Sequence, residues 1–188
     1  MHICLDIDNT IVKNDIVENA IKSYNLPEEY SWDLREFPEN IRKECFDKFN
    51  DPNIMMNLEP KRGARSKIYR WGLFGYNMTC VTSRSLKLKE ITDAFIKTNF
   101  PEITNPVIYV ENNSKKETFK KYNFDVIIDD NPFNIEEAIS LNCIKKIFLI
   151  STKTTPYNHY LFEQIKQRQL YPNVFSVKNI SEVIISDR

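Results

Sequence analysis

The sequence has little glycine, little histidine and no closely paired cysteines. Its 188 residues include three glycines, Gly63, Gly72 and Gly75. Phosphate-binding loops of the P-loop and dinucleotide types need several glycines in one short segment, so both are excluded. The two histidines are too few for a histidine-rich metal site, and the four cysteines form no C-x-x-C pair. We interpret the cysteines as small core residues of a protein from a reducing compartment.

An excess of one charge and long apolar runs are also absent. Lys and Arg together number 26, and Asp and Glu together number 26. Proteins that package duplex nucleic acid carry a clear basic excess, so nucleic acid is a disfavoured partner. No apolar run reaches the length of a membrane span, and Asp6 and Asp8 come too early for a secretory signal peptide. The sequence therefore predicts a soluble, cytoplasmic protein without a membrane partner.

Apolar segments with strand and helix patterns alternate along most of the chain. The length fits one domain with a sizeable insertion. Buried strands are expected at residues 2–8, 77–82, 107–110, 125–128 and 146–150, and helices at about 63–72, 87–99, 115–122 and 133–142. This alternation predicts a three-layer, Rossmann-like α/β fold with a parallel sheet and right-handed crossovers.

Residues 15–59 interrupt the alternation with two apolar helical stripes and no strand signal before about residue 77. Because this insertion follows the first strand, it predicts a small helical cap over the carboxyl end of the sheet. Residues 1–14 and 60–188 then form the core. Trp32 and Phe37 fall outside both stripes, so we expect their rings to face the active site and offer a stacking surface for a nucleobase. Phe49 lies on a stripe and is expected to pack within the cap.

Acidic residues end two of the predicted strands. Asp6 and Asp8 lie at the end of the first strand, and Asp129 and Asp130 follow residues 126–128. Like charges so close together are costly unless a cation binds or a carboxyl is protonated. Ligands of open α/β sheets bind at the carboxyl edge, and carboxylate oxygens suit Mg²⁺, so we expect these acids to form a metal site there. A solvated turn and helix capping by Asn131 and Pro132 are the structural alternatives.

Hydroxyl groups end the strand at 77–82. The side chains and backbone N–H groups of Thr82 and Ser83 are candidates for binding a phosphoryl oxygen. Capping of the next helix by Ser83 or Ser85 is an equally good explanation.

A lysine pair stands at the start of another predicted helix. Ser114 and Glu117 have the spacing of a capping box, which places Lys115 at the first helical residue. Lysine there opposes the helix dipole unless an anion shares the site. The spacing leaves open whether Lys115 or Lys116 points inward.

Together, Asp6–Thr10, Thr82-Ser83, Lys115 and Asp129-Asp130 resemble the four motifs of the haloacid dehalogenase-like phosphohydrolase superfamily. The resemblance covers nearly the whole chain. It implies a Rossmann-like core with a cap inserted after the first strand, Mg²⁺ dependence and an aspartyl-phosphate intermediate.

A closer resemblance lies in residues 49–64. The run Leu58-Glu-Pro-Lys-Arg-Gly-Ala64 is similar to the segment that joins cap and core in the 5'(3')-deoxyribonucleotidase family. That family usually has Gly where this chain has Asn9. The resemblance implies a nucleoside monophosphate as substrate.

These motifs predict a Mg²⁺-dependent phosphomonoesterase. Asp6 is the expected nucleophile, and Asp8 the group that protonates the leaving oxygen and later activates water. Asp6, the Asp8 carbonyl and Asp129, with Asp130 as a second acid, are the expected Mg²⁺ ligands. Thr82, with Ser83, and Lys115 are expected to hold the phosphoryl oxygens.

Three alternatives remain at this stage. A phosphatase acting on nucleic-acid 3' ends would need a basic track, and the Arg and Lys residues of 62–70 are better explained as a solvated helix face. Another small phosphate ester would suit the same chemistry. A non-catalytic binding module has no need of the complete set of charged residues. A homodimer is compatible with the sequence.

Overall fold

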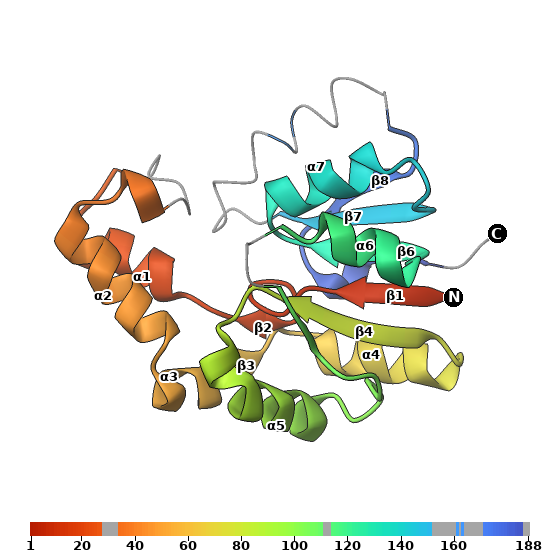
Figure 1. The fold of residues 1–188 in the computed structure, drawn as a ribbon, viewed down its shortest axis with the longest axis horizontal. Helices are drawn as coiled ribbons and strands as arrows, with labels where there is room; N and C mark the ends of the chain where they lie inside the picture. The colour runs from red at the N-terminus through yellow and green to blue at the C-terminus, as the bar shows by residue number, and fades with distance from the viewer. Residues whose placement is uncertain (28–33, 111–113, 152–160, 162, 164–170, 186–188) are drawn as a thin grey trace.

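The core of the protein is a parallel β-sheet between two layers of helices (Figure 1). The computed structural model describes residues 1–27, 34–110, 114–151, 161, 163 and 171–185. The strands lie in the order β5-β4-β1-β6-β7-β8, and each neighbouring pair is parallel. Their bounds are β1 His2–Leu5, β4 Asn77–Thr82, β5 Ile108–Tyr109, β6 Val126–Asp129, β7 Lys146–Ile150 and β8 Val174–Val177. The predicted three-layer α/β class is confirmed.

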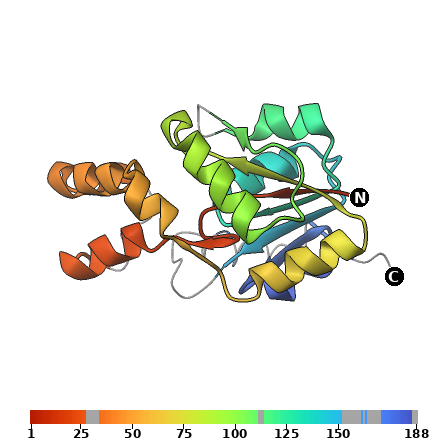
Figure 2. The same cartoon turned by 90° about the horizontal axis from the view of Figure 1, so that it is seen from below.

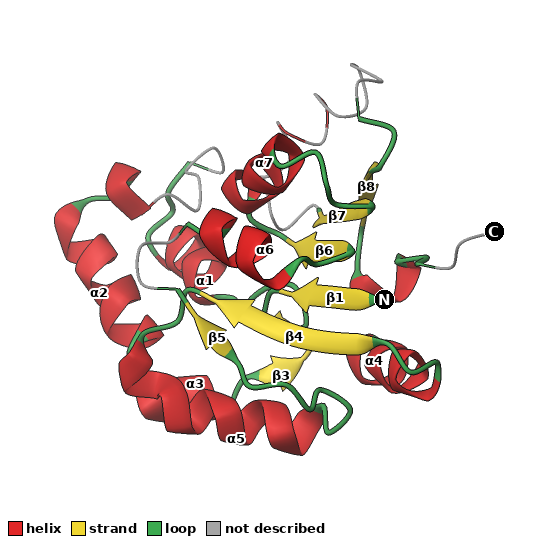
Figure 3. Cartoon of the chain, turned by 45° about the vertical axis from the view of Figure 1, so that its right-hand side comes forward, coloured by secondary structure: helices red, strands yellow, loops and turns green. Residues whose placement is uncertain are grey.

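Successive residues of the central strands point to opposite helical layers. In β1, Ile3 and Leu5 pack with α4 and α5, whereas Cys4 packs with α6 and α7. The two layers lie on opposite sides of the sheet (Figures 1 and 3). Their helices are α4 Ala64–Leu73, α5 Lys89–Asn99, α6 Lys116–Tyr122 and α7 Pro132–Ser140. Because both faces are covered, β1, β4 and β6 are buried almost throughout and do not alternate between buried and exposed residues.

A helical segment extends beyond the carboxyl ends of the strands (Figures 1 and 2). It contains α1 Ile16–Ser23, a 3₁₀ turn at Leu34–Glu36, α2 Glu39–Phe49 and α3 Pro52–Met56. Its apolar residues form a separate cluster with Leu88, which belongs to a 3₁₀ turn before α5. This position agrees with the expected cap, and the cap boundaries at 15 and 59 stay a prediction.

Two very short strands join this segment to the core. β2 Val12–Lys13 and β3 Glu59–Pro60 form an antiparallel pair. The expectation of no further strand between the first strand and about residue 77 was therefore wrong. Two-residue strands have no periodicity, and their partner lies more than forty residues away, so the sequence carries no local signal for them.

The start of α4 depends on a glycine. Gly63 is its N-cap and has φ 82°, and a Cβ there would lie 2.9 Å from the Cβ of Ser181. Only glycine combines this backbone conformation with this close approach. This requirement explains the glycine in the run Leu58–Ala64.

The other expected elements agree closely with the structure. β4 and β7 have the predicted bounds, and α7 begins with the predicted Asn131 cap, whose side chain accepts a hydrogen bond from the N–H of Phe133. β8 was not predicted. Three of the four cysteines are buried, and all four are free thiols. Within the described residues, no helix is both long and apolar enough to cross a bilayer.

Candidate active site

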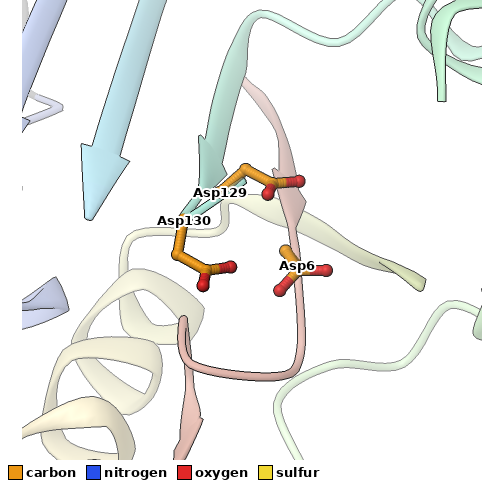
Figure 4. Close-up of side chains that lie close together, drawn as sticks. All are labelled: Asp6, Asp129 and Asp130. Carbon is orange, nitrogen blue, oxygen red and sulfur yellow. The ribbon is translucent and has the colours of Figure 1, made fainter. Parts of the chain in front are cut away.

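Three carboxylates meet where β1 and β6 end. One oxygen each from Asp6, Asp129 and Asp130 lies within 4.8 Å of the others (Figure 4). All three residues are buried, with at most 8% of their surface exposed. The parallel pairing of β1 with β6 produces this meeting, because it brings the carboxyl ends of both strands to one edge.

Lys115 lies between two of these acids. Its Nζ donates to Asp6 Oδ1 at 2.6 Å and to Asp129 Oδ2 at 2.8 Å, and its side chain is 1% exposed. Burial lowers the pKa of Lys115, but Asp129 and Asp6 raise it by more, so the amine stays charged. Lys116 is partly exposed, and among the described residues its ammonium makes no such contact with an acid of the site. Of the two candidates, the structure places Lys115 inward.

The negative charge of the cluster exceeds what Lys115 neutralises. Burial raises the pKa of the Asp6 carboxyl well above its usual range, and the opposing effect of Lys115 is countered by Asp129 and Asp130. A further cation at the cluster would therefore favour the ionised form of Asp6.

The start of α6 differs from the prediction. The helix begins at Lys116, and Ser114 does not form a capping box with Glu117. Instead, Glu137 of α7 accepts hydrogen bonds from Ser114 Oγ at 2.5 Å, from the N–H of Lys115 at 2.9 Å and from the N–H of Lys116 at 3.0 Å. A carboxylate from another helix thus satisfies the N–H groups that the local motif was expected to satisfy, and it holds the backbone of Lys115 in place.

We expect Glu137→Ala to destabilise the fold by about 1–2 kcal/mol, as loss of a helix N-cap does, and to weaken binding of inorganic phosphate. Urea unfolding and phosphate titration measure the two effects. The neighbouring exposed residue supplies the control, Glu136→Ala. Equal stability of the two variants would show that this contact does not hold α6.

The side chain of Asp8 is not part of the acidic cluster. Both of its oxygens accept from the guanidinium of Arg84, at 2.7 and 2.8 Å, and Asn14 Nδ2 donates to Oδ1 at 2.8 Å. Burial raises the pKa of Asp8, but the charge and hydrogen bonds of Arg84, with the Asn14 bond, outweigh it, so the pKa is lowered. The expected metal ligand at this position is the backbone carbonyl, which these contacts leave untouched.

Thr82 and Ser83 have different surroundings. Thr82 is buried, and its Oγ1 accepts from the N–H of Arg84 at 3.2 Å. Ser83 is exposed at the end of β4, whereas Ser85 caps the 3₁₀ turn by accepting from the N–H of Lys87. Of the two serines offered as helix caps, Ser85 has that role. Phosphate binding by Thr82 and Ser83 stays a prediction.

The surroundings of Asn134 indicate that the cluster of Asp6, Asp129 and Asp130 suits a metal ion. Asn134 is 3% exposed, and its Nδ2 donates to Asp129 Oδ2 at 2.9 Å. Its Oδ1 is buried and has no hydrogen-bond partner among the described residues. A buried acceptor without a donor is costly, and a hydrated cation at the three carboxylates would supply one. The all-oxygen donor set fits Mg²⁺.

A second lysine approaches the site from the joint between cap and core. Lys61 Nζ donates to the carbonyl of Asn9. Burial lowers its pKa, and the nearby charges of Asp130, Asp15 and Asp6 oppose that effect. Asn9 has φ 55°, a conformation that favours glycine and that asparagine tolerates best among other residues. The Asn in place of the family's usual Gly is therefore compatible with the same turn.

The structure agrees with some of the predictions for the aromatic residues of the cap and not with others. Phe37 is 4% exposed and packs in the cap's own apolar cluster, so it does not offer an exposed stacking surface in this structure. The sequence placed it in an irregular joint, whereas packing against Ile41 and Cys45 decides its orientation. Phe49 packs against the same cluster, as expected. Trp32 lies outside the described residues.

Sequence reasoning gave no role to several residues of this site. They are Asn14, Lys61, Arg84, Asn134 and Glu137. Asn134 carried a usable signal, because it stands one helical turn after Asp130. Asn14 lies six residues after Asp8, in the turn that follows β1. Lys61, Arg84 and Glu137 contact the site from distant positions in the sequence, and no local pattern reveals such contacts.

Comparisons with known proteins agree with this geometry at the level of fold. No protein-family model and no curated protein matches the sequence. A Thermotoga maritima protein described as a beta-phosphoglucomutase superposes with a TM-score of 0.56 at 14% identity, over 94% of each chain. CbbY from Rhodobacter sphaeroides, solved in complex with phosphate, superposes with a TM-score of 0.52 at 11% identity, over 96% of this chain and 95% of that one. The chain has the haloacid dehalogenase-like fold. At these identities the likeness extends to the fold and not to a substrate.

Proposed function

We propose that the protein is a Mg²⁺-dependent phosphomonoesterase that works through an aspartyl-phosphate on Asp6. The observation that carries the proposal is the meeting of Asp6, Asp129 and Asp130 around the buried Lys115. A carboxylate with a neighbouring cation can attack phosphorus without a general base. CbbY, which shares the fold, was solved with phosphate bound.

The charges of the site support a cation cofactor and an anionic substrate. Four carboxylates converge there, with three cationic side chains around them. They are Asp6, Asp8, Asp129 and Asp130, with Lys61, Arg84 and Lys115. Asp6, Asp129 and Asp130 would hold a divalent ion there. The ion would shift the charge balance in favour of a bound phosphate and would stabilise negative charge on the phosphoryl oxygens.

The remaining roles belong to side chains of this chain. Asp6 attacks the phosphoryl group, while Lys115 and Thr82 hold its oxygens. Asp8 gives a proton to the leaving oxygen and takes one from water in the second step. The test is hydrolysis of p-nitrophenyl phosphate with Mg²⁺ and after addition of EDTA. Activity that EDTA does not reduce would contradict the metal role.

The favoured substrate is a nucleoside monophosphate, and Trp32 is the residue proposed to stack on its base. Stacking on an aromatic ring contributes about 1–3 kcal/mol, so Trp32→Ala is expected to raise KM for a nucleotide about tenfold or more. The KM for a sugar phosphate should change much less. Phe46→Ala serves as the control, because Phe46 is an exposed aromatic residue of the same segment.

The outcome separates recognition from packing. Equal changes in KM for nucleotide and sugar phosphate, or a loss of thermal stability in Trp32→Ala alone, would assign Trp32 a packing role. Comparing mononucleotides with 3'-phosphorylated oligonucleotides would separate a nucleotidase from a phosphatase of nucleic-acid ends.

A further inference from the structure

Arg84 is a buried arginine that the chemistry above does not use. Its side chain is 3% exposed, although arginine is rarely buried without a specific partner. Nε donates to Asp8 Oδ2 at 2.7 Å and Nη2 donates to Asp8 Oδ1 at 2.8 Å. The planar guanidinium therefore holds the carboxylate by a two-point contact, which restricts both its position and its rotation.

Arg84 is itself held at two further points. Nη1 donates to Oγ1 of Thr92, a fully buried residue of α5, at 3.3 Å. The backbone N–H of Arg84 donates to Oγ1 of Thr82 at the end of β4. A cation needed only for charge balance would require neither the two-point contact nor these anchors.

The contacts separate Asp8 from the other acids. Within the described residues, the acidic cluster that could hold a metal consists of Asp6, Asp129 and Asp130 and does not include Asp8. Asn14 donates to the same Asp8 oxygen as Nη2 of Arg84, so the carboxylate is held from two sides. Asp8 nevertheless remains partly accessible, with 28% of its side chain exposed.

We propose that Arg84 is a positioning residue, which sets the place of the Asp8 carboxyl relative to the leaving-group oxygen. The inference rests on the proposed function, in which Asp8 is the proton donor. An Asp6 oxygen forms a bond to phosphorus while the P–O bond to the leaving group breaks and its electron pair goes to the leaving oxygen. That oxygen takes the proton of Asp8, which enters this step as the carboxylic acid. The product is the Asp8 carboxylate, the form that Arg84 and Asn14 bind here.

The test compares substrates that differ in their need for the proton. A p-nitrophenolate leaves without protonation, whereas an alkoxide does not. Arg84→Lys keeps the charge but loses the two-point contact. We expect its kcat/KM for an alkyl phosphate to fall at least tenfold more than for p-nitrophenyl phosphate. Thr92→Val removes one contact that holds Arg84. It should lower the ratio of kcat/KM for the alkyl phosphate to kcat/KM for p-nitrophenyl phosphate, as Arg84→Lys does, but by a smaller factor. The exposed residue Arg70 supplies the control, Arg70→Lys.

A double-mutant cycle tests whether Arg84 acts through Asp8. In an Asp8→Asn background, Arg84→Lys is expected to cause no further change in the substrate ratio. Equal losses for both substrates, no loss, or an additive effect in that background would each overturn the proposal. If Arg84→Lys fails to fold, an unchanged ratio in Thr92→Val overturns it.

Different results would overturn the proposed phosphatase function and the proposed role of Arg84. Absence of p-nitrophenyl phosphate turnover by the wild-type protein, or turnover that survives Asp6→Asn, would overturn the phosphatase assignment and the role of Arg84 with it. Wild-type turnover lost in Asp6→Asn, with an unchanged ratio in Arg84→Lys, would overturn the role of Arg84 alone.

Discussion

Asp6→Asn is expected to reduce turnover of p-nitrophenyl phosphate by at least about a hundredfold, to below a few per cent of the wild-type rate. The amide is nearly isosteric with the carboxylate, but it has no negative charge to attack phosphorus and is a poor metal ligand. Lys115 keeps its contact with Asp129, so the fold should persist. Steady-state kinetics with saturating Mg²⁺ measure the effect, and circular dichroism checks the fold.

A matched aspartate at the opposite end of the sheet supplies the control. Asp125 precedes β6, accepts from the N–H of His2 and pairs with Lys145. Asp125→Asn changes the same chemical group and should keep most of the activity. A folded Asp6→Asn protein with more than a few per cent of wild-type turnover would exclude Asp6 as the nucleophile.

Lys115→Met is expected to be the most destabilising of these substitutions. It leaves Asp6 and Asp129 buried without the ammonium that bridges them. Removing one partner of a buried ion pair costs about 3–5 kcal/mol. Lys116→Met, one residue along and partly exposed, should cost far less. Urea unfolding at pH 7 compares the two variants.

The stability loss in Lys115→Met should depend on pH. Without Lys115, burial and the charges of Asp129 and Asp130 hold the pKa of the Asp6 carboxyl above its unfolded value. The folded state then binds more protons than the unfolded state, so stability falls as pH rises from about 4 toward that raised pKa. The deficit relative to wild type should be small near pH 4 and large at pH 7. A deficit independent of pH, or equal stability of Lys115→Met and Lys116→Met, would contradict this account of the cluster.

Much of the core could be predicted because its elements have local causes. β4 and β7 are apolar runs that a sheet covered on both faces requires. Asn131 and Pro132 begin α7 through contacts within three residues. The candidate acids were recognisable because Asp6, Asp129 and Asp130 directly follow apolar strands, and the parallel topology that this pattern implies brings such strand ends together.

The parts that sequence reasoning missed are long-range contacts. The predicted Ser114–Glu117 capping box is chemically sound, but Glu137 of α7 lies close enough to take the same N–H groups. Phe37 has no helical periodicity to mark it as buried, and it is the packing of α1 and α2 that encloses it.

The sequence by itself determined the α/β class, the order of the elements and the chemical groups that meet at the sheet edge. Periodicity and capping act over a few residues, and residue types alone state which groups are available. Only the tertiary structure decided that Lys115 rather than Lys116 points inward, and that Asp8 pairs with Arg84 while Asp6 joins the acidic cluster. Asp8 and Arg84 are 76 residues apart, and their distance depends on the parallel pairing of β1 with β4, a property of the folded sheet and not of either segment.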